Sequence, residues 1–546
     1  MQPSVQRPAR GFTAFLLFTA CLTGALVMAV EVLGARVIAP FFGVSLFVWT
    51  ALIAVTLLAL ASGYVVGGRW ADRADQHATA GLLYGLIGAA GVLLLLVPWA
   101  RAPVLQAVLP LGLRSGALVG AFLLFSPPLF LLGCVSPLLV RLAASEWSRL
   151  GRTVGLMYAV STAGSFFGTL ITGYYLVAEW GVSRAFLVGG LVLLALAASY
   201  FVLFRRRVMA LAMLLPPTLL LAFSASSRDI SVRLEDGTQA RVIDSHDSFY
   251  GRVQVVEYRG GAGHTREMII DGLVQGGIDV ASGLSVYEYG YMLEHLALAA
   301  NPKGRRCLVI GLGPGVVARR FAERGIDTEV VDIDPVVVSA AQKHFGLPAS
   351  QRVHLHDARY FLASSNERYD YIVLDVFSGD TTPGHLLTRE ALALVRARLA
   401  PDGVLALNMI GNLGANNRMS ASVVRTLETV FPWVRVQPVF VPGEGDGVGN
   451  IAIVAGLGAP LAELPPLDMR RVHPLAQALL QRALAPHYGP RGYVVARPGQ
   501  DALILTDDYN PIDVLDLPLK EAVRLRILQS TPAAILLSRQ MAHPAV

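Results

Sequence analysis

The clearest chemical signal in the chain is a turn of three glycines separated by single residues: Gly311, Gly313 and Gly315. The turn follows an apolar run, Cys307–Ile310, with the composition of a buried strand, and precedes a helical pattern. A second apolar run, Thr328–Val331, leads directly to Asp332. Glycines in such a turn let the backbone approach a ligand, and the acid can accept hydrogen bonds from both hydroxyls of a ribose. The pattern predicts a nucleotide-binding unit. A turn whose glycines serve only packing is the alternative.

Two further carboxylates follow the same arrangement. Asp357 comes shortly after a short strand pattern, Val353–Leu355, and Asp375 directly follows the next one, Tyr371–Leu374. The carboxyl ends of parallel strands lie at one edge of an open α/β sheet, where ligands bind. We therefore expect both acids to face the same crevice as Asp332. Strand and helix patterns alternate throughout this part of the chain, which predicts a Rossmann-like, methyltransferase-type α/β domain.

The composition of the whole chain differs from that of an ordinary soluble protein. Of its 546 residues, 54% are hydrophobic and only 15% are charged, and the mean hydropathy is +0.54. This length predicts two or more domains, and this composition predicts membrane segments. The net charge is +6, but the basic residues near the N-terminus lie between apolar runs. This arrangement is typical of loops that set the orientation of membrane helices and not of a nucleic-acid-binding surface. The three cysteines lack metal-type spacing, so no metal site is expected.

The first 225 residues are dominated by apolar runs of membrane-spanning length. Six runs are long enough to cross a bilayer: Phe12–Leu33, Val44–Val66, Ala80–Trp99, Ser115–Val140, Val154–Ala178 and Arg184–Phe204. No clear cleavage site follows the first run, so a removed signal peptide is not expected. Arginines are concentrated in the segments that lie on the same side of the membrane as the N-terminus, which predicts that this side is the inside. A seventh run, Val208–Phe223, is short and contains two prolines, and whether it crosses stays open.

A strand-rich segment precedes the glycine turn. Polar and apolar residues alternate in four stretches, which predicts a small antiparallel sheet: Ser231–Leu234, Gln239–Ile243, Gly251–Tyr258 and Glu267–Asp271. A glycine-rich loop and a helix from about Ser285 to Leu298 are expected next. The chain is thus expected to contain three parts: a multi-pass transmembrane domain at 1–225, a small β-rich subdomain at 228–300, and the Rossmann-like domain at 301–525.

The order of these motifs resembles that of the spermidine synthases, the polyamine aminopropyltransferases. The resemblance rests on Ser248–Glu257, on Ile270–Gln275, on Tyr289 with His295, and on the glycine turn. A membrane-fused subset of this family carries an N-terminal multi-pass domain, as this chain does. The resemblance implies transfer of an aminopropyl group from decarboxylated S-adenosylmethionine to a polyamine, of the putrescine-to-spermidine type. It also implies a bacterial inner membrane, a cytoplasmic catalytic domain and a homodimer through that domain.

The resemblance also implies roles for individual residues. Asp375 would be the base, because a carboxylate attracts the cationic amine and accepts its proton. The adenosyl donor would be held by the glycine turn and by a second group of residues: Gln275, Asp332, Asp357 and Ala358. The acceptor would be held by residues from several motifs: Tyr250, Tyr289, His295, Asp380 and Asp508. Asp508 belongs to a Thr-Asp-Asp motif that resembles one in the membrane-fused relatives.

Several positions depart from the family's pattern. Pro314 stands where the family has an acid for the donor's aminopropyl amine, and Ser378 stands at the second loop acid, for which Asp380 is the substitute. Gly251 replaces a glutamine, and Tyr291 replaces a glutamate. These departures keep methyl transfer from S-adenosylmethionine as an alternative reaction. A transporter or sensor with a non-catalytic nucleoside-binding domain is the alternative from another class.

Overall fold

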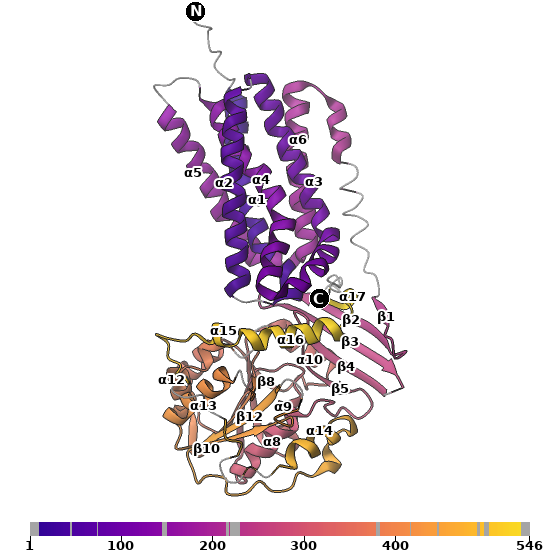
Figure 1. Ribbon diagram of the computed structural model, residues 1–546, viewed down its shortest axis with the longest axis vertical. Coiled ribbons are helices and arrows are strands. Elements are labelled where there is room, and N and C mark those ends of the chain that lie inside the picture. The colour runs from indigo at the N-terminus through magenta and orange to yellow at the C-terminus, as the bar shows by residue number, and fades with distance from the viewer. Residues whose placement is uncertain are drawn as a thin grey trace, which may run out of the picture. The chain divides into compact units, whose positions relative to one another are not determined.

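A computed structural model describes residues 10–43, 46–73, 75–144, 150–214, 218, 230–261, 263–377, 383–414, 417–444, 447–486, 488, 492–495 and 502–536. The chain divides into two compact units (Figure 1). The first unit comprises Met1–Arg228 with Arg539–Val546, and the second comprises Asp229–Ser538.

The first unit is a helical bundle. Its long helices are α1 (Arg10–Phe42), α2 (Leu46–Arg73), α3 (Gln76–Val108), α4 (Gly112–Ala143), α5 (Leu150–Ile171) and α6 (Val182–Arg205). Shorter elements are η1 (Leu109–Leu111), the π-helical η3 (Thr172–Trp180) and η4 (Val208–Leu214). Five segments of the described residues have the length and hydropathy to cross a membrane, and one of them, His77–Ala143, contains both α3 and α4. Most of the seventh apolar run after Leu214 lies outside the described residues.

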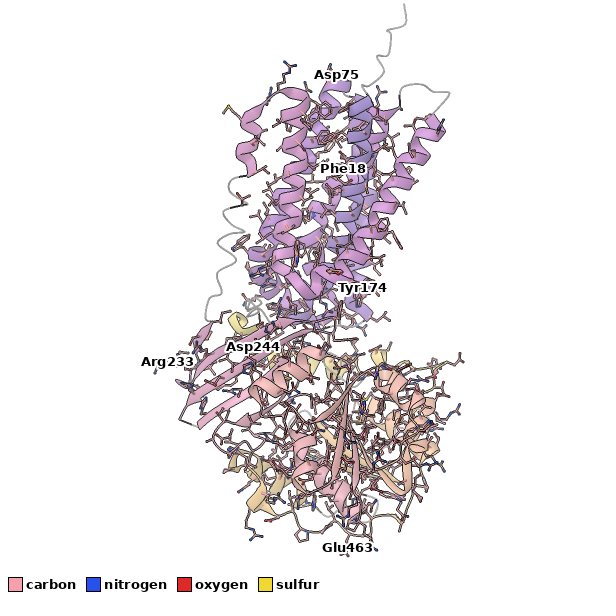
Figure 2. All side chains as sticks on the ribbon, turned by 180° about the vertical axis from the view of Figure 1, so that it is seen from behind. Phe18, Asp75, Tyr174, Arg233, Asp244 and Glu463 are labelled. Carbon is pink, nitrogen blue, oxygen red and sulfur yellow. The ribbon has the colours of Figure 1, made fainter. Side chains whose placement is uncertain are left out.

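Packing inside the bundle is close, whereas its outer surface stays apolar. A Cβ atom on Gly164 of α5 would overlap the carbonyl oxygen of Cys21 on α1, so these two helices touch backbone to backbone. Large apolar side chains nevertheless remain uncovered, such as Phe18 at 56% exposure (Figure 2). A bundle with an apolar exterior is what a lipid-facing surface requires.

The second unit begins with a five-stranded antiparallel sheet in the order β1-β2-β3-β4-β5. Its strands are β1 (Ser231–Arg233), β2 (Gln239–Asp247), β3 (Arg252–Gly260), β4 (Gly263–Ile270) and β5 (Leu273–Asp279). The sequence pattern predicts the first four strands but not β5, because Gly276 and Gly277 interrupt the alternation. A two-residue turn joins β4 to β5, and both of its residues, Asp271 and Gly272, have positive φ.

The larger sheet has seven strands in the order β11-β12-β10-β9-β6-β7-β8. Its strands are β6 (Arg306–Ile310), β7 (Asp327–Asp332), β8 (Arg352–Leu355), β9 (Tyr369–Leu374), β10 (Leu399–Asn412), β11 (Trp433–Pro438) and β12 (Val448–Gly456). Strands β6 to β10 are parallel to one another, whereas β12 is antiparallel to β10 and to β11. The order reverses between β6 and β9, at the switch point where open α/β sheets bind ligands. The expectation of an α/β, methyltransferase-like fold is confirmed.

Helices cover both faces of this sheet, so its strands are apolar on both sides. On β6, Leu308 and Ile310 join one core cluster while Cys307 and Val309 join the other. The described helices of this unit are α8 (Tyr289–Ala300), α9 (Val316–Glu323), α10 (Pro335–His344), α11 (Ala358–Ser364), α12 (Arg389–Ala397), α13 (Arg418–Val430), α14 (Pro474–Leu484), α15 (Ile512–Leu515), α16 (Leu517–Ser530) and α17 (Ala533–Leu536), with η5 (Gly384–Leu386) and η6 (Met469–Arg471). The helix expected from Ser285 begins four residues later, at Tyr289.

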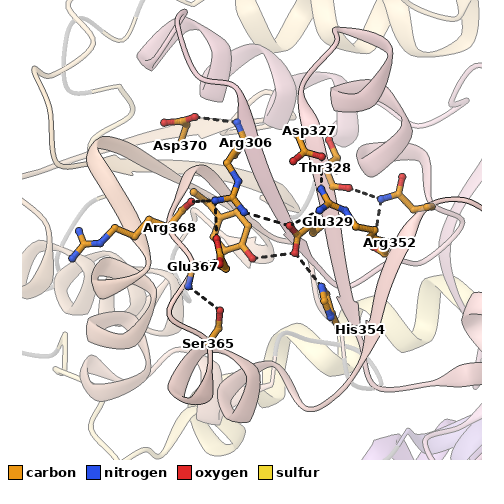
Figure 3. A network of polar contacts seen from close by, with 12 residues as sticks. Arg306, Asp327, Thr328, Glu329, Arg352, His354, Ser365, Glu367, Arg368 and Asp370 are labelled. Carbon is orange, nitrogen blue, oxygen red and sulfur yellow. Dashed lines mark hydrogen bonds and ion pairs between the residues drawn. The ribbon is translucent and has the colours of Figure 1, made fainter.

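A buried carboxylate, Glu329 of β7, ties four parallel strands together (Figure 3). It lies 3.0 Å from His354 Nε2, accepts a 3.2 Å hydrogen bond from the Tyr369 hydroxyl, and pairs with Arg352 at 3.3 Å and Arg306 at 3.5 Å. Three of these partners are the first residues of their strands: Arg306, Arg352 and Tyr369. The network therefore lies toward the amino ends of the strands, away from the edge where the predicted ligand-binding acids lie.

Candidate functional site

The glycine turn between β6 and α9 has a backbone that only glycine adopts readily. Gly311, Gly313 and Gly315 all have positive φ, at 89°, 50° and 77°. A Cβ atom on Gly311 would also overlap the carbonyl oxygen of Asp375. The turn therefore brings the end of β6 against the end of β9, which is the close backbone approach that the sequence pattern predicts.

Asp332 closes the other side of this turn. Its Oδ2 accepts a hydrogen bond from the Leu312 backbone N–H, and its Oδ1 accepts one from the Asp334 N–H, both at 2.8 Å. Burial raises the pKa of Asp332 to about 6, although these hydrogen bonds oppose the shift. Each carboxylate oxygen has a second lone pair, so the side chain can still accept bonds from a ligand.

Asp375 directly follows β9, and its backbone N–H donates to the Ile310 carbonyl at 2.9 Å. Asn408 of β10 donates from Nδ2 to Asp375 Oδ1 at 2.8 Å. Burial raises the pKa of Asp375 to about 6, and the bond from Asn408 works in the opposite direction. A carboxyl that ionises near neutral pH is suited to act as a general base.

Tyr289 and Pro314 lie next to the same turn. The Tyr289 hydroxyl donates to the Gln275 carbonyl at 2.9 Å. A Cβ atom on Gly276 would lie 2.9 Å from that hydroxyl and 3.0 Å from Pro314 Cγ, so the three groups converge. Burial, and next the charge of Asp375, raise the pKa of Tyr289. The structure thus brings Tyr289, Pro314 and Asp375 to one place, with the Gln275 side chain turned back toward the Leu273 carbonyl at 3.3 Å.

Asp357 lies at a more open end of the site. It caps α11, whose first residue is Ala358, by accepting a 2.9 Å hydrogen bond from the Tyr360 N–H, and it lies 3.6 Å from His385 Nε2. Tyr250 is half-exposed in the hairpin between β2 and β3. Burial, followed by the charges of Asp334, Asp357 and Asp332, raises the pKa of Tyr250, so this ring lies among the acids of the predicted donor site.

Other predicted residues are placed elsewhere. His295 lies six residues beyond Tyr289 on α8, and its Nε2 is 2.8 Å from the Pro465 carbonyl oxygen. Asp508 is exposed, whereas its neighbour Asp507 pairs with Arg359 near His385. Asp380 and Ser378 lie outside the described residues. The structure therefore does not bring His295 or Asp508 to Asp375, and their roles stay predictions.

Two departures from the family pattern have structural explanations. A Cβ atom on Gly251 would lie 2.8 Å from Asp271 Oδ2, which leaves no room for a glutamine. The Tyr291 hydroxyl donates to the Ser285 carbonyl at 2.8 Å and accepts the His473 N–H at 3.1 Å, so it fixes the start of α14. Sequence reasoning overlooked Asn408, although a polar residue within the apolar run Val404–Met409 was a visible signal.

Comparison with known proteins gives consistent relatives. A family model described as the spermine/spermidine synthase domain matches residues 287–457. A polyamine aminopropyltransferase of Vibrio vulnificus is 32% identical over 228 residues, which cover 40% of this chain and 72% of that protein. An N-terminal histidine N-methyltransferase of Emericella nidulans is 36% identical over 197 residues, covering 33% of this chain. The match spans only 35% of that fungal protein.

Among solved structures, a probable spermidine synthase from Corynebacterium glutamicum is similar to this chain with a TM-score of 0.39 and 21% sequence identity. The similarity covers 48% of this chain and 95% of that one.

Proposed function

The chain belongs to the spermidine synthase family, and we propose that its second unit transfers an aminopropyl group from decarboxylated S-adenosylmethionine to a polyamine. The observation that carries the proposal is Asp375, a buried carboxyl at the switch point of the sheet whose pKa is raised to about 6. At neutral pH it is ionised and can attract a cationic amine, and it lies beside a glycine turn suited to an adenosyl group.

The proposed reaction assigns a task to each group. Asp332 would accept hydrogen bonds from the ribose hydroxyls, Asp357 and the Ala358 backbone would bind the adenine edge, and Gln275 would lie near the ribose or sulfur end. Asp375 would take one proton from the acceptor ammonium. The freed nitrogen lone pair would then form a C–N bond to the aminopropyl carbon while the C–S bond breaks. The sulfur keeps that electron pair, and the positive charge passes to the product amine. Positioning supplies much of the remaining rate.

The proposed acceptor contacts differ in their support. Tyr289 and Tyr250 lie among the acids of the site, which favours a role for both in holding a cationic chain. His295, Asp380 and Asp508 remain proposals from the family resemblance alone. Within the residues that the structure describes, no group of three or more His, Cys, Asp or Glu side chains is arranged to hold a metal ion, and the proposed reaction needs none.

A product assay tests the reaction. The purified full chain would be incubated with putrescine or spermidine and with either donor. Release of 5′-methylthioadenosine is the expected result. Asp375→Asn should lower kcat by at least about 100-fold, in the range of a lost general base, whereas Asp402→Asn, at an exposed position near the start of β10, should not. Full turnover by Asp375→Asn with every acceptor would refute the assignment of the base.

Methyl transfer is the second candidate, and Pro314 is the observation that favours it. A proline beside Gly276 offers no charge for the donor's aminopropyl ammonium. In the same assay, formation of S-adenosylhomocysteine from S-adenosylmethionine, without release of 5′-methylthioadenosine, would support methyl transfer and refute aminopropyl transfer. Donor binding by calorimetry without either product would instead support a sensor, the non-catalytic alternative.

We also propose that the first unit spans the bacterial inner membrane, with the second unit in the cytoplasm and a homodimer formed through the second unit. The apolar segments of the bundle support the first part, and the loop arginines support an inside N-terminus. A reporter enzyme fused after Val546 should be active only in its cytoplasmic form. Activity of a periplasm-specific reporter would refute this topology. Light scattering of the detergent-solubilised chain at twice the protomer mass would support the dimer, and the mass of a single protomer would refute it.

A further inference from the structure

A buried amide lies beside the proposed base. Asn408 interrupts an apolar stretch of β10, Val404–Met409, and is 1% exposed. A polar side chain in a central strand lowers stability unless its donors and acceptors are satisfied. Packing alone would favour an apolar residue at this position, so packing does not explain why an asparagine is present.

Strand register brings Asn408 to the site. Leu407 of β10 pairs with Leu374 of β9, so the next residues on the two strands, Asn408 and Asp375, stand side by side at the carboxyl end of the sheet. The amide Nδ2 donates to Asp375 Oδ1 at 2.8 Å. The amide Oδ1 is buried, and among the described residues it has no hydrogen-bond partner. Since Oδ1 and Nδ2 share one carbon, this free acceptor also lies close to the carboxyl.

We propose that Asn408 is a positioning residue that binds both the base and the acceptor amine. Its Nδ2 holds one oxygen of Asp375 and leaves the other oxygen for the amine, and its Oδ1 accepts an N–H of that amine. This inference rests on the proposed transfer reaction. A primary amine that has given one proton to Asp375 keeps two hydrogens, one for the carboxyl oxygen and one for the amide oxygen. A secondary amine keeps only one, so the site should prefer primary amines.

The groups around Asp375 determine how its pKa should change when Asn408 is replaced. From the neighbouring elements, Tyr289 faces it from α8, and Asp332 of β7 lies across the glycine turn. Among the described residues, Asn408 is the one that donates a side-chain hydrogen bond to this carboxyl. Removing that donor destabilises the carboxylate relative to the acid, so Asp375 should titrate at a higher pH.

The test compares Asn408→Leu with Gln437→Leu in the full chain. Gln437 is a matched control, because it is also a buried amide in the same sheet, on β11, where it donates to the Ala483 carbonyl at 3.3 Å. Two readouts are used. The first is the infrared titration of the Asp375 carboxyl, taken as the difference from Asp375→Asn. The second is kcat/KM against pH for putrescine and for its N,N′-dimethyl derivative.

In Asn408→Leu, the infrared midpoint and the acid limb of kcat/KM should rise by about one pH unit or more. The preference for the primary amine should fall roughly tenfold, the effect of one lost hydrogen bond. Gln437→Leu should change neither. If Asn408→Leu does not fold, Asn408→Ala provides the same comparison with a smaller side chain.

An unshifted infrared midpoint would refute the positioning role, and this readout needs no turnover. A shifted midpoint with an unchanged preference for primary amines would refute the contact with the amine. If the wild-type chain releases no product from either donor, the proposed function fails, and the infrared titration still decides whether Asn408 controls Asp375.

Discussion

At the level of single residues, Gly311 has little freedom to vary. Its φ of 89° and its approach to the Asp375 carbonyl both exclude a side chain. Gly311→Ala should therefore separate β6 from Asp375, cost about 2 kcal/mol or more in stability, and lower kcat/KM by about 100-fold. Gly261→Ala is the control, because a Cβ atom there meets nothing within 4 Å. Chemical denaturation and the product assay measure both effects. Wild-type behaviour of Gly311→Ala would show that the turn adopts another conformation.

Asp375 should lower the stability of the folded state at every pH at which its carboxyl is ionised. Burial raises its pKa from 3.8 to about 6, so the folded state prefers the neutral acid. Its penalty is therefore absent below the unfolded pKa of about 4, grows as pH rises toward 6, and is complete above that. Asp375→Asn should be more stable than the wild type by about 1–3 kcal/mol at pH 7.5, and this advantage should shrink toward zero near pH 4. Denaturant titrations at several pH values measure the difference. An advantage that does not change with pH would contradict the raised pKa.

Residues in local patterns were predictable, and residues brought together by register were not. The glycines and Asp332, Asp357 and Asp375 stand at strand ends that the sequence itself marks. Asn408 becomes relevant only because Leu407 pairs with Leu374, which no local pattern encodes. His295 shows the reverse case. Its motif was recognisable, but the helix places it against Pro465 and not beside Asp375.

At the level of elements, the Glu329 network decides how firmly the parallel strands are joined. Glu329→Ala would leave the buried Tyr369 hydroxyl without its acceptor, and it would remove the shared partner of the partly exposed Arg306 and Arg352. The loss should be about 1–3 kcal/mol, the cost of a buried polar group left without its partner. Glu323→Ala should cost no more than about 1 kcal/mol, because the Glu323 side chain is half exposed and its pair with Arg319 is long, at 3.6 Å. Denaturant midpoints compare the two. Equal losses would show that the buried network contributes no more than a surface pair.

The strands and helices of the larger sheet were predictable because apolar strands and amphipathic helices alternate there. The main failure was β5 of the smaller, five-stranded sheet, where Gly276 and Gly277 replace the side chains that alternation needs. Its pairing with β4 also shifts register between Met268 and Ile269. The strand exists because the tight turn at Asp271 and Gly272 folds the chain back onto β4. An Asp-Gly pair is a hairpin signal of its own, which the side-chain period does not contain.

At the level of the whole molecule, composition located the helical unit but not the ends of its helices. The sequence predicts an end near Trp99, whereas α3 continues to Val108 with Pro98 and Pro103 inside it. Proline ends helices in water, but packed apolar helices tolerate it because neighbouring groups can satisfy the freed carbonyls. Hydropathy therefore reports which segments avoid water and not where each helix stops.

The exposed apolar face of α2 offers a direct test of membrane insertion. Leu57, near the middle of α2, is 63% exposed, and Leu46, at its first residue, is 66% exposed. In water, arginine at either position should have little effect, because both side chains are uncovered. In a bilayer, Leu57→Arg should cost about 2.5–3.5 kcal/mol, whereas an arginine at the helix end can extend to the interface. Leu57→Arg should therefore reduce the amount of chain recovered in alkali-washed membranes, and Leu46→Arg should not. Equal recovery of the two variants would mean that this face of the bundle does not lie in lipid.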